Sequence, residues 1–344
     1  MRILRVEEAI GFELGHDITK IIPGEFKGVA FKKGHIIRLE DIEELLAIGK
    51  ENIYVVSDDD ELLHENEAAE ILRDLVAGEG ITFNEVREGK SGLIADRDGL
   101  LKIDVEALFS LNYLGDIILS TLHNNTIVKR GCNVAATKII PLEIKKEKIE
   151  EAKDLIKSKL GTEKIVKVIP INKKKTAIIT TGSEVYSGRI KDSFGPLLKD
   201  KLDKYGCEIL GQSIIPDEAE KVKEAISMWL GKGAEMILCT GGMSVDADDI
   251  TAKAIKASGA EIIVYGTPVL PGAMLLLAYN GNIPIVGIPG GALFSKNTIF
   301  DIILPRILAG ERIERKDIAA YGYGGLCMNC NICTFPKCTF GKGI

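Results

Sequence analysis

Two groups of residues in this sequence have the types and the spacing that chemistry requires. The first consists of turns rich in Gly, Ser and Thr that follow strand-like apolar segments between residues 175 and 312. The second consists of four cysteines within twelve residues near the C-terminus. Turns of the first kind are typical of sites for anionic ligands, and cysteine runs of the second kind are typical of metal centres.

The turns of the first group combine backbone donors with carboxylates. They read Thr181-Gly182-Ser183-Glu184, Pro216-Asp217, Thr240-Gly241-Gly242-Met243-Ser244 and Pro289-Gly290-Gly291. Where such a turn leads into a helix, its free N–H groups and the helix dipole favour a negatively charged group such as phosphate. Glu184, Asp217 and Asp249 would repel a phosphate unless a divalent cation such as Mg²⁺ lay between them. The residues therefore predict a site for a phosphorylated small molecule and a hard metal ion.

The second group follows the spacing Cys327-x2-Cys330-x2-Cys333-x4-Cys338. Four thiolates can hold a [4Fe–4S] cluster or a structural Zn²⁺ ion, and the tandem two-residue gaps favour the cluster. Disulfides are disfavoured because the chain shows no secretion signal. The glycines at 322, 324 and 325 suggest a flexible tether. We therefore expect the tail to order around a metal, and deletion of residues 321–344 to cost little stability.

Other reaction classes receive little support from the sequence. All four histidines precede residue 124, so no local histidine can activate Ser244 for hydrolysis through a Ser–His pair. Three scattered cysteines, Cys132, Cys207 and Cys239, lie in apolar surroundings and are expected to be small buried hydrophobic residues.

Composition narrows the range of partners. The 344 residues are 46% hydrophobic and 27% charged, with a net charge of −6, which is typical of a globular chain of about two domains. An acidic chain without a large basic face is a poor candidate for a nucleic-acid binder. The densest apolar run, residues 273–279, is far shorter than the about 18 residues of a membrane span. No targeting signal is visible, so we expect a cytoplasmic protein.

The segments that must position the turns alternate between strands and helices. Strands are predicted over residues 176–180, 207–215, 235–239 and 261–265, with a hairpin formed by 274–279 and 283–288. Helices are predicted over 190–205, 218–230, 248–257 and 293–308. This alternation predicts an α/β fold for residues 175–312, a doubly wound and mostly parallel sheet with helices on both faces. In such sheets ligands bind at the carboxyl ends of the strands.

The chain before residue 175 predicts a smaller, mixed region, α+β or rich in β-strands. Its helices are expected over residues 61–77 and 146–160. The division that we expect is a small β-rich domain (1–57), a mixed α+β domain (58–145), a connecting helix and strand (146–174), the α/β domain (175–312) and a Cys-rich metal-binding tail (320–344).

Two stretches of the α/β region resemble a known family. TTGSEVYSGRIKDSFGPLLKDKLDKYG and LCTGGMSVDADD are similar to signature segments of the molybdopterin-binding domain found in molybdenum-cofactor biosynthesis proteins. The larger subfamily comprises the molybdopterin molybdotransferases, including the gephyrin E-domain type. The resemblance implies binding of molybdopterin or its adenylylated form, Mg²⁺ as a cofactor, metal-assisted insertion of molybdate or tungstate, and a homo-oligomer.

The resemblance also implies roles for particular residues. Glu184, Asp217 and Asp249 match the acidic residues around nucleotide, metal and molybdate, and are the expected catalytic group. The expected cofactor-binding residues are Thr181, Gly182, Ser183, Asp192, Ser193, Thr240, Gly241, Gly242, Ser244, Pro271, Gly272, Pro289 and Gly290.

Departures from the family pattern keep a second function open. Phe194 stands in place of Asn, Asp246 in place of Gly, Ala273 in place of Lys and Gly291 in place of Asn. The transferases' N-terminal P-x-x-D-x-S-x-M-D-G-Y stretch is not found. The sequence thus fits an enzyme that inserts the metal. The alternative is a non-catalytic molybdopterin carrier or sensor for an anaerobic molybdenum or tungsten oxidoreductase. A weaker alternative is a nucleotide pyrophosphate hydrolase of the competence-damage-inducible type.

Overall fold

The computed structural model describes residues 1–22, 24–56, 60–243 and 250–343. The chain divides into two compact units that are not contiguous in sequence. The first contains Met1–Asp96, Asp104–Leu122 and Gly131–Lys167, and the second contains Arg97–Ile103, His123–Arg130 and Val168–Ile344.

The first unit begins with a small β-rich part, in which two strand pairs and one helix surround a core of nine buried apolar residues. Its elements are β1 (Arg2–Arg5), η1 (Val6–Glu8), β2 (Ile18–Ile22), β3 (Phe26–Phe31), α1 (Asp41–Ala47) and β4 (Asn52–Val55). β1 pairs antiparallel with β4, and β2 with β3.

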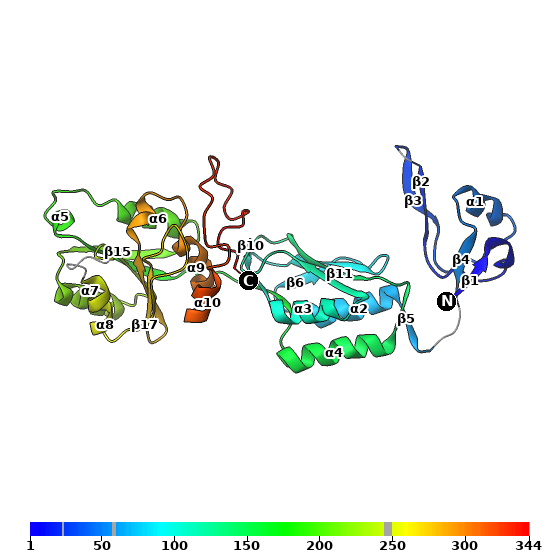
Figure 1. Ribbon diagram of the computed structural model, residues 1–344, viewed down its shortest axis with the longest axis horizontal. Coiled ribbons are helices and arrows are strands. Elements are labelled where there is room, and N and C mark those ends of the chain that lie inside the picture. Colours follow the sequence, from blue (N-terminus) through cyan, green and yellow to red (C-terminus); the bar gives the residue numbers. More distant parts are fainter. Residues whose placement is uncertain (23, 57–59, 244–249, 344) are drawn as a thin grey trace. The chain divides into compact units, whose positions relative to one another are not determined.

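The rest of the first unit is an antiparallel four-stranded sheet, in the order β6-β7-β11-β9, packed against helices (Figure 1). Its elements are β5 (Leu62–His64), α2 (Glu65–Val76), β6 (Ile81–Phe83), β7 (Lys90–Ala95), α3 (Val105–Tyr113), β9 (Ile117–Thr121), β11 (Asn133–Ile139), β12 (Glu143–Lys145) and α4 (Lys146–Leu160). The predicted helix over 61–77 begins later, at Glu65, because residues 62–64 pair with β12 and the His64 ring accepts the Asn66 N–H.

The second unit is built on a six-stranded sheet in the order β15-β14-β16-β19-β18-β17. Two short segments precede it, β8 (Gly99–Ile103) and β10 (Ile127–Val128), and β13 (Val166–Ile169) leads into it. Its further elements are β14 (Lys175–Thr181), α5 (Ser183–Tyr186), α6 (Phe194–Asp203), β15 (Glu208–Ile215), α7 (Ala219–Gly231), β16 (Met236–Thr240), α8 (Thr251–Ala257), β17 (Glu261–Tyr265), β18 (Leu276–Asn280), β19 (Ile283–Ile288), η2 (Gly290–Leu293), α9 (Ile299–Leu308) and α10 (Arg315–Ala320).

Helices cover both faces of this sheet, because its strands are apolar on both sides. Along β14, Ala177 and Ile179 join the core beneath α7 and α8, whereas Ile178 between them joins the core beneath α6 and α9. The side-chain period of two in a strand sends neighbours to opposite faces. β14, β15, β16 and β19 run parallel to one another. β18 runs antiparallel to both of its neighbours, β17 and β19. The predicted doubly wound, mostly parallel α/β sheet is confirmed.

α9 begins later than the sequence indicates. The predicted start was residue 293, but residues 290–293 form the 3-10 helix η2 and the α-helix begins at Ile299. Thr298 and Asp301 form a capping box. The Thr298 side chain accepts the backbone N–H of Asp301, and the Asp301 side chain accepts the backbone N–H of Thr298. This pair fixes the helix start.

The C-terminal tail packs into the core of the second unit. Tyr321 is 3% exposed and Phe340 is 4% exposed within the core beneath α9. The expectation that the glycines at 322, 324 and 325 form a flexible tether is wrong. Burial of Tyr321 and Phe340 also contradicts the expectation that deletion of residues 321–344 costs little stability. A side chain at Gly325 would place its Cβ 2.4 Å from the Tyr321 carbonyl oxygen, and the Gly325 carbonyl accepts the Leu270 N–H at 2.8 Å.

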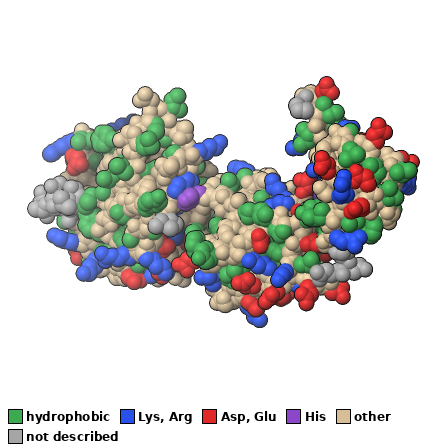
Figure 2. Space-filling model, turned by 45° about the vertical axis from the view of Figure 1, so that its right-hand side comes forward, with side chains coloured by type: hydrophobic (Ala, Val, Ile, Leu, Met, Phe, Trp, Pro, Cys, Tyr) green, Lys and Arg blue, Asp and Glu red, His purple; other side chains and the backbone are tan. Residues whose placement is uncertain are grey.

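Surface charges are mixed in sign. Figure 2 shows lysine and arginine side chains lying among aspartate and glutamate side chains on the face in view. In the described ranges, no helix has both the length and the apolar character that crossing a bilayer demands.

Because Phe340 is buried, we predict that Phe340→Ala lowers the free energy of unfolding of the second unit by about 3–5 kcal/mol. The matched control is Phe294→Ala, whose ring is 91% exposed and whose loss should change stability by less than about 0.5 kcal/mol. Fluorescence of Trp229, the single tryptophan, reports on this unit during denaturant unfolding. Equal effects of the two substitutions would contradict the packing of the tail.

Candidate functional site

The strand-end turns predicted from the sequence lie at one edge of the six-stranded sheet. β15, β14, β16 and β19 are neighbours and run parallel, so their carboxyl ends share that edge. Pro271 and Gly272 reach the same edge because they precede β18, which is antiparallel to β19. The structure thus brings residues 181–184, 216–217, 240–243, 271–272 and 289–291 to one edge. Ser244 and Asp249 lie outside the described residues, as does Asp246.

Four buried threonines fix the turns after β14 and β16. The Thr181 hydroxyl donates to the Thr240 carbonyl at 3.2 Å and lies 3.3 Å from the Thr251 hydroxyl. Thr251 in turn donates to the Gly241 carbonyl at 3.0 Å, and Thr240 donates to the Thr180 hydroxyl at 3.1 Å. These hydroxyls point into the protein and satisfy one another. Thr181 and Thr240 therefore support the turns, and their hydroxyls are not free for a ligand.

Gly241 and Gly242 allow this close approach of backbones. Both have positive φ, +84° and +53°. A Cβ at Gly241 would lie 2.2 Å from the Thr181 carbonyl oxygen, and one at Gly242 would lie 2.7 Å from the Thr251 hydroxyl oxygen. Both conformation and space therefore require glycine.

The carboxylate of Asp217 holds the turn after β14. The Ser183 N–H donates to Asp217 Oδ2 at 2.8 Å, and the Asp217 N–H donates to the Ser183 hydroxyl at 3.5 Å. The exposed Glu184 extends back over Gly182, where a Cβ would lie 2.9 Å from Glu184 Oε1. The two carboxylates thus flank the same turn. Asp217 occupies a backbone donor that an anionic ligand would otherwise use.

The side chain of Asp192 binds the first N–H groups of α6 and ties this helix to the threonine layer. Its oxygens accept the N–H groups of Phe194 at 2.9 Å and Gly195 at 3.0 Å, which is why α6 begins at residue 194 and not at 190. Gln212 donates to Asp192 at 2.6 Å and to the Thr180 hydroxyl at 2.9 Å. Gln212 was not among the residues predicted from the sequence, although a polar residue in the middle of an apolar strand was the available signal. Ser193, the N-cap residue of α6, is exposed, and its side chain makes no capping hydrogen bond.

The turn after β19 leaves backbone open. An added Cβ at Gly290 or Gly291 would meet no atom within 4 Å. Gly272, with φ +113°, instead packs closely against α9, where a Cβ would lie 3.0 Å from side-chain atoms of Thr298 and Ile299. Gly290 and Gly291 are exposed where a ligand can reach them, whereas Pro289 is buried. Gly272 mainly sets the distance between its turn and α9.

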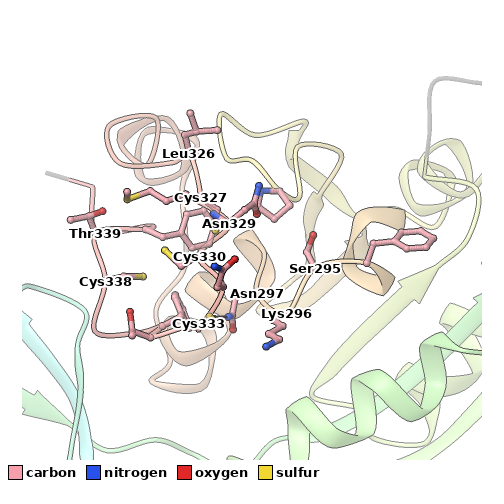
Figure 3. A pocket seen from close by; sticks show the side chains of 17 residues that line it. Ser295, Lys296, Asn297, Leu326, Cys327, Asn329, Cys330, Cys333, Cys338 and Thr339 are labelled. Atoms are coloured by element: carbon pink, nitrogen blue, oxygen red, sulfur yellow. Dashed lines mark hydrogen bonds between the residues drawn. The ribbon is translucent and has the colours of Figure 1, made fainter.

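The four tail cysteines are free and line one cavity of about 270 Å³ (Figure 3). Pro271 and residues 294–297 line the same cavity. Asn297 Nδ2 donates to Cys333 Sγ at 3.2 Å. Throughout the part of the chain that the structure describes, no three His, Cys, Asp or Glu side chains are gathered closely enough to hold one metal ion.

The other cysteines differ from these four. Cys207 and Cys239 are buried as predicted, and burial raises the pKa of the Cys239 thiol to about 12. Cys132 is only half-buried, which corrects the expectation for that residue.

Comparison with known families identifies the sheet domain. Residues 177–309 match a family described as "probable molybdopterin binding domain", and this span contains every described strand-end turn. Residues 177–309 form a molybdopterin-binding domain. Residues 3–57 match a family described only as a domain of unknown function.

Curated relatives of this domain carry names of two kinds, proteins of molybdenum cofactor biosynthesis and CinA-like proteins. A molybdenum cofactor biosynthesis bifunctional protein of Chlorobaculum tepidum is 25% identical over 144 residues, which are 39% of this chain and 46% of that protein. A molybdopterin molybdenumtransferase of Synechococcus elongatus is 28% identical over 109 residues, 29% of this chain and 27% of that protein. The chain thus spans less than half of the length of these relatives.

Solved structures resemble this chain over part of its length. A tungsten cofactor synthesizing protein of Pyrococcus furiosus is 22% identical, and the match covers 40% of this chain and 98% of that one with a TM-score of 0.33.

The molybdopterin-binding domain should tolerate a side chain at Gly290 but not at Gly241. We predict that Gly241→Ala lowers the free energy of unfolding by at least about 1–2 kcal/mol, because φ is left-handed and the added Cβ meets the Thr181 carbonyl. The control Gly290→Ala should change it by less than about 0.5 kcal/mol. Denaturant unfolding followed by Trp229 fluorescence measures both, and similar values for the two would count against the described packing of the turns.

Proposed function

We propose that this protein binds molybdopterin or adenylylated molybdopterin at the carboxyl edge of its six-stranded sheet and assists insertion of molybdate or tungstate. The observation that carries the proposal is the gathering of the strand-end turns at one edge of a domain that matches the molybdopterin-binding family. The names of the curated relatives from cofactor biosynthesis support it.

Backbone groups carry the binding in this proposal. The threonine layer uses the hydroxyls of Thr181 and Thr240 internally, so binding falls to backbone groups of the turns. Of these, the Gly182 N–H already donates to the Ile215 carbonyl at 3.2 Å. Gly290 and Gly291 leave their backbone uncovered by side chains. Fixed N–H donors suit the phosphate and the amide-like edge of a pterin, because they need no reorganisation when the ligand binds.

The carboxylates supply the catalytic part of the proposal. Glu184 and Asp217 flank the turn after β14, and Asp249 is the third member implied by the family resemblance. Bound Mg²⁺ would polarise the phosphoanhydride of the adenylylated ligand. Asp217 would exchange its bond to the Ser183 N–H for the cation, which frees that N–H for the phosphate.

A carrier or sensor role for an anaerobic molybdenum or tungsten oxidoreductase is the second candidate. One observation in its favour is that the Asp217 carboxylate already accepts the Ser183 N–H and so holds the turn. Another is that Ala273 stands where the family has a lysine. The tail thiolates are proposed to bind a metal, as an iron–sulfur cluster or zinc, in either role. A homo-oligomer is part of the proposal in both cases.

Calorimetry of the full chain under anaerobic conditions should detect micromolar or tighter binding of molybdopterin. We predict that Gly290→Asp weakens this binding at least about tenfold, since it adds a negative charge to the open part of the edge. The control Gly231→Asp adds the same charge at the exposed end of α7, before β16 and so away from the carboxyl edge, where space is also open and φ is not positive. Absence of binding, or equal weakening by both variants, would refute the proposed site.

Catalysis separates the two candidates. If the protein is a transferase, Asp249→Ala should abolish molybdate-dependent release of AMP and leave pterin binding largely intact, because the carboxylate acts on the transition state. Asp200→Ala, on the exposed side of α6, is the control and should keep full turnover. No AMP release by the wild-type protein would favour the carrier role, and unchanged turnover in Asp249→Ala would remove that residue from the catalytic group.

A further inference from the structure

The cavity between the cysteine tail and the loop before α9 has the properties of a site for a polynuclear cluster. We propose that it holds a [4Fe–4S] cluster, and not a single zinc ion, through Cys327, Cys330, Cys333 and Cys338. This inference rests on the proposed metal binding by the tail thiolates. It selects the iron–sulfur cluster over zinc.

The separation of the cysteines argues against a single ion. Zinc lies about 2.3 Å from each sulfur, so four thiolates around one ion must lie about 3.8 Å from one another. In the described ranges, no three potential ligands are gathered in this way, yet all four cysteines line the same cavity of about 270 Å³. A cubane of four irons and four sulfides holds its thiolates farther apart, with a core that fills space between them.

Contacts at both ends of the cysteine loop, residues 327–338, hold this loop beside the cavity. On one side the Cys327 N–H donates to the Leu270 carbonyl at 2.8 Å, next to the bond from Leu270 to Gly325. On the other side Phe340 is buried, and the Gly341 N–H donates to the Gly324 carbonyl at 2.9 Å. Residues 327–338 are therefore a closed loop. Cluster binding has to move the cysteines only within this loop, which limits its entropic cost.

Two N–H groups already point at the sulfurs. Asn297 Nδ2 lies 3.2 Å from Cys333 Sγ, and the Asn329 N–H donates to Cys327 Sγ at 3.5 Å. Such donors stabilise thiolate charge and raise the reduction potential of iron–sulfur clusters. Asn297 belongs to the loop between β19 and α9, so the site joins the tail to a segment that follows a predicted pterin-binding turn. Lys296 in the same wall adds a positive charge beside the anionic cluster.

Anaerobic reconstitution of the full chain with Fe²⁺ and sulfide tests this proposal, with Zn²⁺ alone as the parallel arm. We expect about four irons and four acid-labile sulfides per chain and an absorbance band at about 400 nm. Cys333→Ser should lose the band, whereas Cys132→Ser, in the first unit, should keep it. Binding of one zinc without any labile sulfide would overturn the cluster but keep the proposed metal centre. Binding of neither metal would overturn both.

The hydrogen bond from Asn297 to Cys333 can be tested separately, through the midpoint potential of the cluster. Asn297→Ala should shift the midpoint potential of the cluster to a more negative value, because one hydrogen bond to a sulfur is lost. Asn331→Ala removes another amide from the cavity wall and is the matched control. Equal potentials in the two variants would contradict the role of Asn297. Pterin calorimetry on the same samples shows separately whether the ligand site is intact.

Discussion

The contact between the ends of β14 and β16 is the constraint on which the candidate site depends. Gly241 passes so close to Thr181 that any side chain at residue 241 would meet its carbonyl oxygen at 2.2 Å. The hydroxyls of Thr181 and Thr251 close this contact, because they bond to each other and to the carbonyls of Thr240 and Gly241. Because these hydroxyls are satisfied inside the protein, they hold the turns in place at the edge of the sheet. The link from Thr180 through Gln212 to Asp192 extends the same layer to the start of α6.

Much of this arrangement could be predicted from the sequence, because it depends on local signals. Fully apolar strands such as residues 176–180 indicate a sheet covered on both faces, and parallel strands must end at a common edge. The placement of the turns after β14, β15, β16 and β19 followed from that rule alone. The resemblance to the molybdopterin-binding family, now matched over residues 177–309, supplied the ligand class, which periodicity does not contain. The domain ranges and the roles of the site residues stay predictions.

What the sequence did not reveal depends on contacts between distant residues. The start of α9 is fixed by Thr298 with Asp301, and the start of α6 by Asp192, which is itself held by Gln212 from a neighbouring strand. The tail looked like a tether because its glycines lack local structure, but those glycines are there for close packing, as at Gly325 against Tyr321. The long-range contacts of Phe340 with the core beneath α9 leave no periodic signal. The same holds for the bond from Asn297 to Cys333, 36 residues apart.

Amide hydrogen exchange with and without molybdopterin tests the central claim most directly, because the claim concerns backbone N–H groups. The ligand should slow exchange in residues 182–184, 241–243 and 290–292 together, since these turns share one edge of the sheet. Exchange in the hairpin turn at residues 280–282, at the opposite edge, should stay unchanged. Protection confined to the first unit, or to the opposite edge, would contradict the account.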